Sequence, residues 1–526
     1  MKLPSVSYSR FNKSVFGATL LLGATCLTAW TKVNESLIPA ADNVGAAMMP
    51  AEIAAISAPF LMPPLTRPRF PSLRVVVVLG ATEELATRAI QAAIDEVSAK
   101  NGGTVILSKG VWKTGRLSLK SNVNLHLESG AELQFSGRVE DYQPAVFTRT
   151  EGVEVFSLGA LIYANGQENI SLTGQGRLIG PPLDSPMRKQ KNRVSVDKID
   201  ARQPVVERRC DGRGGGPVYL PVFFGPINCR NVLVEGLTFE QSALWNIVPQ
   251  YCDRVIIRGV TVESEKIPSG DGIDVDSSRN VLIEYCTFSC GDDCVVIKAG
   301  RGEDALRVDK SSEFIVMRNC LVRKGHAGIS TGSETGGMIR NLYVCDSVFQ
   351  EPVVGIRLKT RRPRAGGGEK LYYERIRIGQ CSTAIAWDML GESKFVGEEA
   401  SRLPERAVTK LTPVYRDVTI KQVLAEKARF AIKVIGIPES PAANIVIEDV
   451  TATTTERPII LNDVDGFALR NADIKSANDT IGFLDARKVV FENCRFDTTT
   501  GQLNLDVAGE RSREIEFRNC TPTPRQ

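Results

Sequence analysis

Acidic side chains are concentrated in two short segments near the middle of the chain. The first reads Ser-Gly-Asp-Gly-Ile-Asp-Val-Asp over residues 269–276, and the second reads Cys-Gly-Asp-Asp-Cys over residues 290–294. The 21 residues between Asp271 and Asp292 are close to one structural repeat, and equivalent positions on adjacent strands lie about 4.8 Å apart. We therefore expect Asp271, Asp292 and Asp293 to cluster. Clustered carboxylates raise the proton affinity of at least one member, which suits hydrolysis of a glycosidic bond.

The spacing of these acids leaves two other roles open. Aspartate is common in turns, where its side chain bonds the local backbone, and we favour that structural role for Asp274 and Asp276. Three or four carboxylates could instead bind calcium. Spacing alone does not choose between a hydrolase and a calcium site.

Histidine is rare in this chain, which has only two. His326 is flanked by small residues just past a predicted strand, and it follows Asp293 by 33 residues. When the charged insertion at 301–311 is subtracted, about one repeat separates the two residues. A histidine one repeat from an acid cluster is suited to control protonation; a solvent-exposed turn histidine is the alternative.

Two cations follow at alternating positions in Gly-Ile-Arg-Leu-Lys, residues 355–359. Arg357 and Lys359 share one face of the expected strand, and that face must point outward because an inward pair would bury charge. Outward, they could bind an anionic substrate group, Arg357 in a two-pronged way. A pair of solvated surface charges is the alternative.

The elements that must position these residues are short repeated strands. Each repeat alternates apolar and polar residues, recurs every 21–25 residues where no insertion intervenes, and cannot bury its inner face unless its neighbours stack on it. The leucine and asparagine pattern of leucine-rich repeats is missing. These repeats predict an all-β parallel β-helix, and examples are residues 230–239, 279–288, 313–322, 340–349 and 488–496.

One amphipathic helix precedes the repeats. Apolar residues at helical spacing predict it over 83–100, with Thr82 as its N-cap and the Asn-Gly-Gly at 101–103 as its end, and we expect it to cap the stack. Insertions at 181–216 and 301–311 interrupt the repeats. We expect them to be surface loops, and either cleft walls or tolerated insertions.

Composition restricts the partners and the compartment. The 526 residues carry 65 basic and 61 acidic side chains, a net charge of +4, which does not favour nucleic-acid binding. Residues 1–30 have the charged start and short apolar core of a signal peptide. We therefore expect export to the periplasm or the extracellular space, a linker over 31–68, and a β-helix domain over 69–526 without membrane insertion. Most of the twelve cysteines lie in strand-like runs and are expected to be buried thiols.

These motifs resemble glycoside hydrolase family 28, the polygalacturonases. The family's Asn-Thr-Asp-Gly appears as Ser-Gly-Asp-Gly at 269–272, its Gly-Asp-Asp-Cys at 291–294, its Gly-His-Gly as Gly-His-Ala at 325–327, and its Arg-Ile-Lys as Arg-Leu-Lys at 357–359. The resemblance is clearest over about residues 155–390. It implies a single-stranded, right-handed parallel β-helix of the pectin lyase-like type.

The resemblance also implies an inverting hydrolysis that uses no metal and no cofactor. Asp292 would be the general acid, Asp271 and Asp293 would activate the attacking water, and His326 would maintain the proton of the acid. Acid and base would have to lie roughly 6.5–9.5 Å apart to admit that water.

On the same resemblance, Arg357 and Lys359 would bind the carboxylates of an acidic galacturonide, polymeric or oligomeric, and the protein is expected to act as a monomer. Trp245 and Asn246 lie about one repeat before Asp271 and are candidates for a sugar subsite, although tryptophan is more often packed. A calcium-dependent, pectate lyase-like enzyme and a non-catalytic carbohydrate-binding β-helix are the alternatives.

Overall fold

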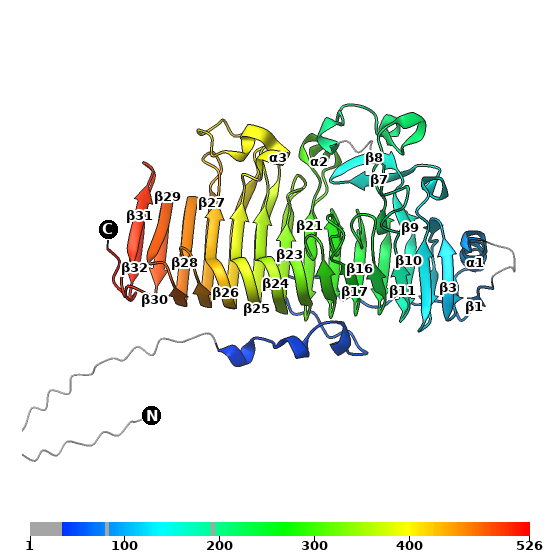
Figure 1. The fold of residues 1–526 in the computed structure, drawn as a ribbon, viewed down its shortest axis with the longest axis horizontal. Helices are drawn as coiled ribbons and strands as arrows, with labels where there is room; N and C mark the ends of the chain where they lie inside the picture. Colours follow the sequence, from blue (N-terminus) through cyan, green and yellow to red (C-terminus); the bar gives the residue numbers. More distant parts are fainter. Residues whose placement is uncertain (1–33, 79–83, 191–194, 526) are drawn as a thin grey trace, which may run out of the picture.

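The computed structural model describes residues 34–78, 84–190 and 195–525, so the predicted signal peptide lies outside the described residues. The chain forms a right-handed parallel β-helix, an elongated stack of coils with α1 at one end and the C-terminus at the other (Figure 1). This confirms the predicted fold class. Among the described residues, no helix is both long and apolar enough to span a membrane.

The first coils are built from short strands of two to seven residues. They are β1 (Arg74–Val76), β2 (Gly103–Leu107), β3 (Gly110–Thr114), β4 (Leu117–Ser118), β5 (Val123–Leu127), β6 (Ala131–Phe135), β9 (Ala160–Asn165), β10 (Glu168–Gly174) and β11 (Arg177–Ile179).

The middle coils carry the acidic motifs. Their strands are β13 (Val222–Ile227), β14 (Arg230–Glu235), β15 (Thr238–Glu240), β16 (Asp253–Arg258), β17 (Thr261–Ser264), β18 (Ile273–Asp276), β19 (Arg279–Glu284), β20 (Thr287–Cys290), β21 (Val295–Lys298), β22 (Ser312–Arg318) and β23 (Leu321–Thr331).

Longer strands that bend around the coil form the C-terminal half. They are β24 (Ile339–Lys359), β25 (Gly367–Asp388), β26 (Val414–Ile435), β27 (Ala442–Thr454), β28 (Ile459–Ser476) and β29 (Thr480–Glu492), followed by β30 (Arg495–Thr498), β31 (Asn504–Ala508) and β32 (Arg513–Arg518).

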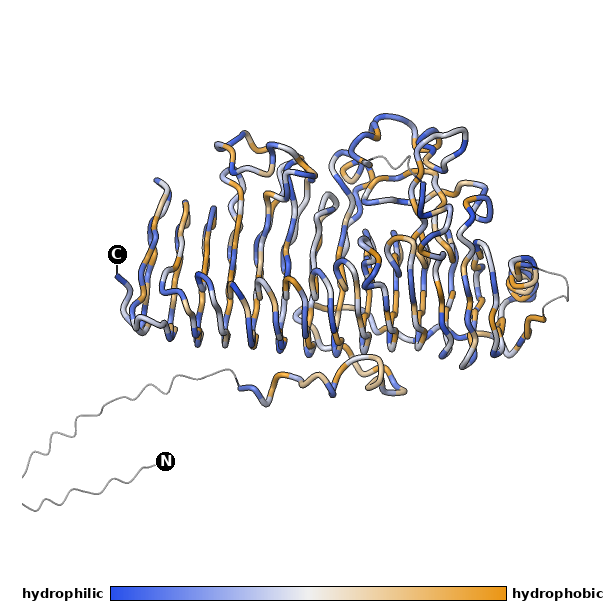
Figure 2. The backbone as a smooth tube through the Cα atoms, in the orientation of Figure 1, coloured by the Kyte–Doolittle hydropathy of each residue, from blue (hydrophilic) through white to orange (hydrophobic). Residues whose placement is uncertain are grey.

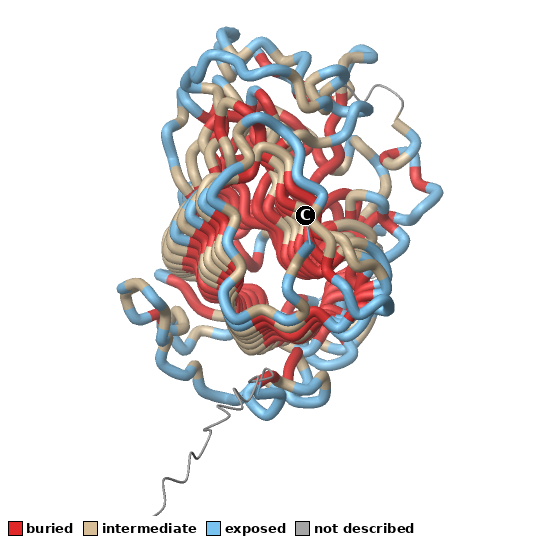
Figure 3. The backbone as a smooth tube through the Cα atoms, turned by 90° about the vertical axis from the view of Figure 1, so that its left-hand side faces the viewer, coloured by how far each residue is buried: buried red, intermediate tan, exposed pale blue. Residues whose placement is uncertain are grey.

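The repeats seen in the sequence are one strand from each coil. Along that face, Val232 pairs with Val255, Val255 with Val281, Val281 with Ile315, and Ile315 with Leu342. Apolar residues alternate with polar ones along these strands (Figure 2), and the end-on view shows buried stretches recurring from coil to coil behind the more exposed C-terminal coil (Figure 3). All eleven cysteines in the described part are free and ten are buried, which confirms the prediction of buried thiols.

The capping helix is shorter than predicted. Helix α1 spans Thr87–Ala99 and its N-cap is Ala86, which makes no side-chain cap, whereas Thr82 lies outside the described residues. Its buried face is Ile90, Ala93, Ile94 and Val97, as the helical spacing predicted, and it packs on β2, β4 and β5. The helix ends before Asn101 and Gly102 because both residues have a positive φ, 69° and 109°.

The insertions are more ordered than the predicted loops. Helix α2 (Gly302–Val308) occupies most of 301–311. Residues 181–216 include the short helices η5 (Val196–Lys198), η6 (Val205–Glu207) and η7 (Arg213–Gly215) and strand β12 (Arg209–Cys210). Strand β12 pairs with β8 (Val153–Ser157), which forms an antiparallel hairpin with β7 (Val146–Thr150).

A third insertion, between β25 and β26, contains α3 (Ser393–Val396) and η8 (Gly397–Ala400). Helices α2 and α3 and the β7–β8 hairpin all rise above the same side of the stack (Figure 1). The coils therefore supply a regular platform, and the insertions stand around one part of it.

The predicted linker over 31–68 is not free chain. Residues 34–70, which we call the outer strap, run along the outside of the stack (Figure 1). Leu65 packs against Leu233, Ile256 and Leu282. The Nε of Arg67 in the strap donates to the carboxylate of Glu235 at 2.8 Å. The correction has a physical cause: the apolar residues scattered through this segment match apolar side chains on the outer face of the β-helix.

Replacing Leu65 with aspartate should release the strap locally. Leu65 is 7% exposed, whereas Leu61 is 95% exposed. Losing a buried leucine costs about 1.5–3 kcal/mol before the cost of burying charge is added. Because cleavage follows the population of the open form, trypsin should cut the Arg69–Phe70 bond at least about tenfold faster, whereas the Arg67–Pro68 bond resists trypsin in any case. Leu61→Asp is the matched control and should not change the cleavage rate; equal rates in both variants would show that the strap is not held at Leu65.

Candidate active site

The acid cluster lies just before the first residues of two stacked strands. Ile273 of β18 pairs with Val295 of β21, so Asp271 and Asp293 occupy equivalent positions on adjacent coils. The backbone N–H of Gly272 donates to the carbonyl oxygen of Asp293 at 3.0 Å. The predicted proximity of the acids, based on one repeat of spacing, is therefore present in the structure.

His326 occupies the next coil at the position equivalent to Asp292. Its backbone N–H donates to the carbonyl oxygen of Asp292 at 2.9 Å, and its ring Nδ1 lies 3.3 Å from Oδ1 of Asp292 and 3.8 Å from Oδ1 of Asp293. The Asp292 and His326 side chains are 35% and 40% exposed, whereas that of Asp293 is 1% exposed. Asp292 and His326 can thus meet a ligand, and Asp293 lies beneath them.

Arg357 and Lys359 come to the same point from β24. The Nζ of Lys359 donates to Oδ2 of Asp293 at 2.6 Å, and Nη1 of Arg357 lies 3.9 Å from Oδ1 of Asp293. Burial opposes ionisation of Asp293, but Lys359 and Arg357 outweigh it and hold the pKa of Asp293 below its usual value. Lys359 is therefore ion-paired with Asp293, which the sequence did not predict. Arg357 lies farther from that carboxylate and is the more available of the two cations for a ligand.

The Nδ1 atom of His326 faces two groups that compete for it. Nη1 of Arg357 lies 3.2 Å away and can only donate, while Oδ1 of Asp292 lies 3.3 Å away. If Nδ1 accepts from Arg357, it has no proton for Asp292. Its single lone pair is then occupied as well, so Nδ1 can bond Arg357 or Asp292 but not both at once. If the unprotonated Nδ1 serves Asp292 instead, the proton between them must reside on Asp292.

Asp271 is the acid of the cluster whose negative charge is least stabilised by its neighbours. It is buried, and its Oδ1 has no hydrogen-bond partner among the described residues. Burial raises the pKa of Asp271 well above its usual value, and the charges of Asp274 and Asp292 raise it further. Asn246 supports this residue from below, since its Nδ2 donates to the Asp271 carbonyl at 2.9 Å. The prediction that Asn246 contacts sugar is wrong, because the side chain is fully buried.

A buried lysine that sequence reasoning missed lies beside the acids. The Nζ of Lys298 lies 3.1 Å from Oε2 of Glu334, 3.4 Å from Oδ1 of Asp274 and 4.4 Å from the centre of the Trp245 ring. Burial opposes ionisation of Glu334, yet Lys298 and Arg301 hold its pKa below the usual value. The alternation Val-Val-Ile-Lys at 295–298 was the available signal, since it makes Lys298 face outward as Lys359 does.

The predicted turn role of Asp274 and Asp276 is wrong. Both lie within β18, Asp276 as its last residue, and both are buried, Asp276 against Arg149 of the β7–β8 hairpin and Asp274 against Lys298 of β21. Asp276 pairs with the buried guanidinium of Arg149 at 3.0 Å. Burial raises the pKa of Asp274 to about 7, opposed by Lys298.

These residues line an open cleft of about 470 Å³. Asp271, Asp292 and His326 line it with Arg357 and Lys359. Trp245 also lines it but is buried and packs in the core, so its role in a sugar subsite stays a prediction. Further cations reach the cleft from Arg361 and Lys394, which belong to the segments that leave β24 and β25. The cleft therefore brings together carboxylates that can exchange protons and cations that can hold an anion.

Asp292, Asp293 and His326 are also the described residues best placed to hold a metal ion, with candidate ligand atoms within 4.8 Å of one another. Calcium prefers six to eight oxygen ligands. This set offers two carboxylates and an imidazole, and Lys359 already bonds one Asp293 oxygen. The donor set fits a proton-transfer cluster better than a calcium site.

Comparison with known proteins points to one family. The profile of "Glycosyl hydrolases family 28" matches residues 208–468. A probable polygalacturonase of Vitis vinifera is 26% identical over 404 residues, covering 74% of this chain and 76% of the relative. An exo-poly-alpha-D-galacturonosidase of Dickeya chrysanthemi is 28% identical over 313 residues, covering 55% of this chain and 51% of the relative.

Solved structures agree with this. The exopolygalacturonase from Thermotoga maritima superposes with a TM-score of 0.69 at 29% identity, covering 78% of this chain and 93% of that one. A polygalacturonase from Erwinia carotovora shares the fold, with a TM-score of 0.53 at 20% identity, over 88% of this chain and all of that one.

Removing the Lys359 charge should destabilise the protein in a pH-dependent way. Because the pKa of Asp293 is lowered in the folded state, its ion pairs contribute stability above about pH 4, and that contribution is lost as the pH falls further. Lys359→Met should reduce the free energy of unfolding by about 3 kcal/mol at pH 7, as expected for a broken buried pair. The difference should shrink below pH 4 in urea unfolding measured across pH.

Lys394→Met is the matched control. Its side chain is 64% exposed, so its ion pair with Glu392 should contribute less than about 1 kcal/mol at any pH. A Lys359→Met effect that stays constant down to pH 3 would contradict the assignment of Asp293 as its partner.

Proposed function

This chain belongs to family 28 of the glycosyl hydrolases and is a glycosidase, and on that premise we propose that it hydrolyses α-1,4 linkages between galacturonic acid residues of pectic polymers or oligomers. The observation that carries the proposal is the cluster of Asp271, Asp292 and Asp293 with Arg357 at its edge. Acids able to exchange protons and a cation for a uronate carboxylate meet in one cleft. The named relatives act on such substrates.

Asp292 is assigned as the general acid. It is the most exposed of the three carboxylates, and its Oδ1 faces Nδ1 of His326 at 3.3 Å. When the unprotonated Nδ1 serves Asp292 rather than Arg357, it accepts the proton of a protonated Asp292. His326 then keeps a proton on Asp292 until the leaving oxygen of the glycoside takes it.

Asp271 and Asp293 are assigned to the attacking water. Asp293 stays ionised because Lys359 and Arg357 neutralise its surroundings, and Asp271 stands at the equivalent position one coil away. A water between them would lose its proton as it attacks the anomeric carbon, opposite the departing oxygen. The product therefore has inverted anomeric configuration, which proton NMR of the first product formed would reveal.

Arg357, Arg361 and Lys394 are assigned to the uronate carboxylates, since all three line the cleft. Lys359 acts mainly through Asp293. The predicted signal peptide and this substrate support action in the periplasm or outside the cell, and we propose that the enzyme acts as a monomer.

Asp292→Asn tests the assignment of the acid. Loss of a general acid lowers kcat by about 10²–10⁴-fold, so release of reducing ends from polygalacturonate should fall by that factor while the fold persists. Asp309→Asn is the matched control, because Asp309 is exposed and its φ of 50° suits asparagine equally well. Full activity of Asp292→Asn would refute the role. A calcium-dependent lyase would instead release products that absorb in the ultraviolet, and a chelator would stop their formation.

The raised pKa of Asp271 predicts the acid limb of the pH profile. A base must be ionised, so kcat/KM should fall as the pH drops through the pKa of Asp271, well above that of an ordinary carboxyl group. Asp274→Asn removes a neighbouring negative charge and eases that ionisation. The acid limb should move to lower pH by about one unit or less, whereas Asp309→Asn should not move it. If the acid limb of the pH profile does not move in Asp274→Asn, the charge of Asp274 does not raise the pKa of Asp271.

A further inference from the structure

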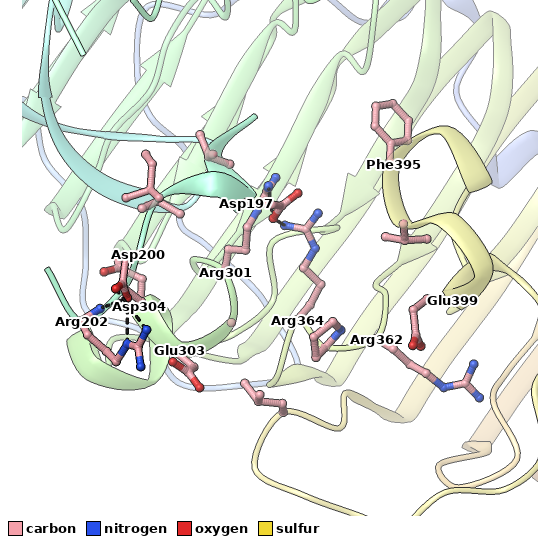
Figure 4. Close-up of a pocket in the computed structure, with 18 residues that line it drawn as sticks. Asp197, Asp200, Arg202, Arg301, Glu303, Asp304, Arg362, Arg364, Phe395 and Glu399 are labelled. Atoms are coloured by element: carbon pink, nitrogen blue, oxygen red, sulfur yellow. Dashed lines mark hydrogen bonds and ion pairs between the residues drawn. The ribbon is translucent and has the colours of Figure 1, made fainter. Parts of the chain in front are cut away.

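A second cavity of about 760 Å³, which we call the side chamber, adjoins the catalytic cleft and is not used by the proposed reaction. Asp197, Arg301, Arg364 and Phe395 line both spaces, so the chamber opens where the cleft ends. Figure 4 shows Asp197, Arg301 and Arg364 converging at the centre, with Phe395 on the opposite side. Most of the wall comes from the three insertions, and the rest comes from Val153 of β8 and from residues 362–364 between β24 and β25. The insertion residues that line it lie within 196–202, 301–304 and 395–399 and at Leu411.

The charges in the chamber wall are mostly neutralised by partners of their own. The described lining residues of the chamber hold no group of neighbouring cations comparable to Arg357, Arg361 and Lys394 of the cleft. A carboxylate would therefore gain little by entering. The pairs are Asp197 with Arg301 at 2.9 Å, Asp200 with Arg202 at 3.0 Å, Asp304 with Arg208 at 2.6 Å and Arg362 with Glu439 at 2.9 Å.

The rest of the lining is apolar and partly exposed. Ile199 contributes from the η5 side, and Val396 and Leu411 contribute from the opposite insertion. Phe395 stands exposed at the junction, with the Arg361 guanidinium 4.6 Å and the Lys394 ammonium 4.7 Å from its ring centre. An aromatic ring and aliphatic side chains suit the C–H face of an uncharged sugar ring, while the two cations remain on the cleft side.

Arg364 supplies an unsatisfied donor at the junction. Its side chain is 5% exposed, and its Nη1 has no hydrogen-bond partner among the described residues. The nearest carboxylates, on Asp197 and Glu334, are 3.9 and 3.8 Å from Nη1. A buried guanidinium N–H without an acceptor is costly, and a sugar hydroxyl or ring oxygen placed there would satisfy it.

We propose that the side chamber binds an uncharged sugar unit attached to the galacturonide, so that the preferred substrate is a galacturonide carrying a neutral glycosyl unit. This inference rests on the proposed function and sharpens its substrate class. The volume is typical of a pocket that holds a small ligand. The uronate lies on the cations of the cleft, and the neutral unit passes Phe395 and Arg364 into the chamber.

The test compares three substrates of equal galacturonide length: unsubstituted trigalacturonic acid, the same trimer with one neutral pentosyl branch, and the same trimer linked at one end to a neutral hexose. For the wild-type enzyme, kcat/KM for one of the two substituted trimers should exceed that for the plain trimer by about tenfold or more. The branched and end-linked forms show whether the chamber receives a side chain or a neighbouring main-chain sugar.

Ile199→Trp and Val396→Trp fill the chamber from opposite walls, so that misfolding of one insertion cannot explain both results. In each, the ratio of kcat/KM for the favoured substituted trimer over that for the plain trimer should fall toward one. Val408→Trp is the matched control, since Val408 belongs to the same insertion as Val396, is exposed and does not line the chamber. Its ratio should equal that of the wild type.

Two results would overturn the inference: a wild-type enzyme that cleaves the plain trimer as well as both substituted ones, or a preference that survives both chamber-filling variants. Failure to cleave any of the three trimers would instead refute the proposed function, so the two failures are distinguishable.

Discussion

Each coil of this protein is hydrogen-bonded to the next in parallel register, and side chains at equivalent positions therefore stack about 4.8 Å apart along the molecule. This constraint turns a distance in sequence into a contact in space. Asp271 lies beside Asp293 because Ile273 pairs with Val295, and His326 lies beside Asp292 because Val295 pairs with Ile329. A shift of one residue in either pairing would send the acids into the apolar interior.

Stacking carboxylates so closely is electrostatically unfavourable. The same register also brings cations beside them, which offsets part of the repulsion. Cations on the following coils reach back to individual acids: Lys359 to Asp293 and Lys298 to Asp274 and Glu334. Among the described residues Asp271 has no such direct partner, and burial raises its pKa. The neighbouring acids therefore differ in proton affinity, as proton transfer in glycosidic cleavage requires.

The insertions have a different structural role from the coils. The coils fix the acids, since their backbone is held on both sides by neighbouring strands. The hairpin of β7 and β8, helix α2 and the segment around α3 cover the outer faces of those strands and enclose both the cleft and the side chamber. The coils therefore position the acid cluster, and the insertions supply much of the wall of the two spaces beside it.

Much of the fold and part of the site were determined by the sequence itself. The alternation and spacing of the repeats specify stacked coils, because each strand has one apolar face to bury, and the same spacing brings Asp271, Asp292, Asp293 and His326 together. Arg357 and Lys359 also follow from alternation. These features depend on local periodicity, which can be read along the chain.

Only the tertiary structure shows which outward-facing residues are buried by segments that are distant in the sequence. Lys298, Asp274 and Asp276 have the alternation of exposed residues, yet they are buried because the insertions fold back over their strands. Residues 34–68 have the composition of a linker, yet they pack along the β-helix. Asn246 supports Asp271 from beneath. In each case the deciding neighbour is distant in sequence and outside the repeat, so no local periodicity encodes the contact.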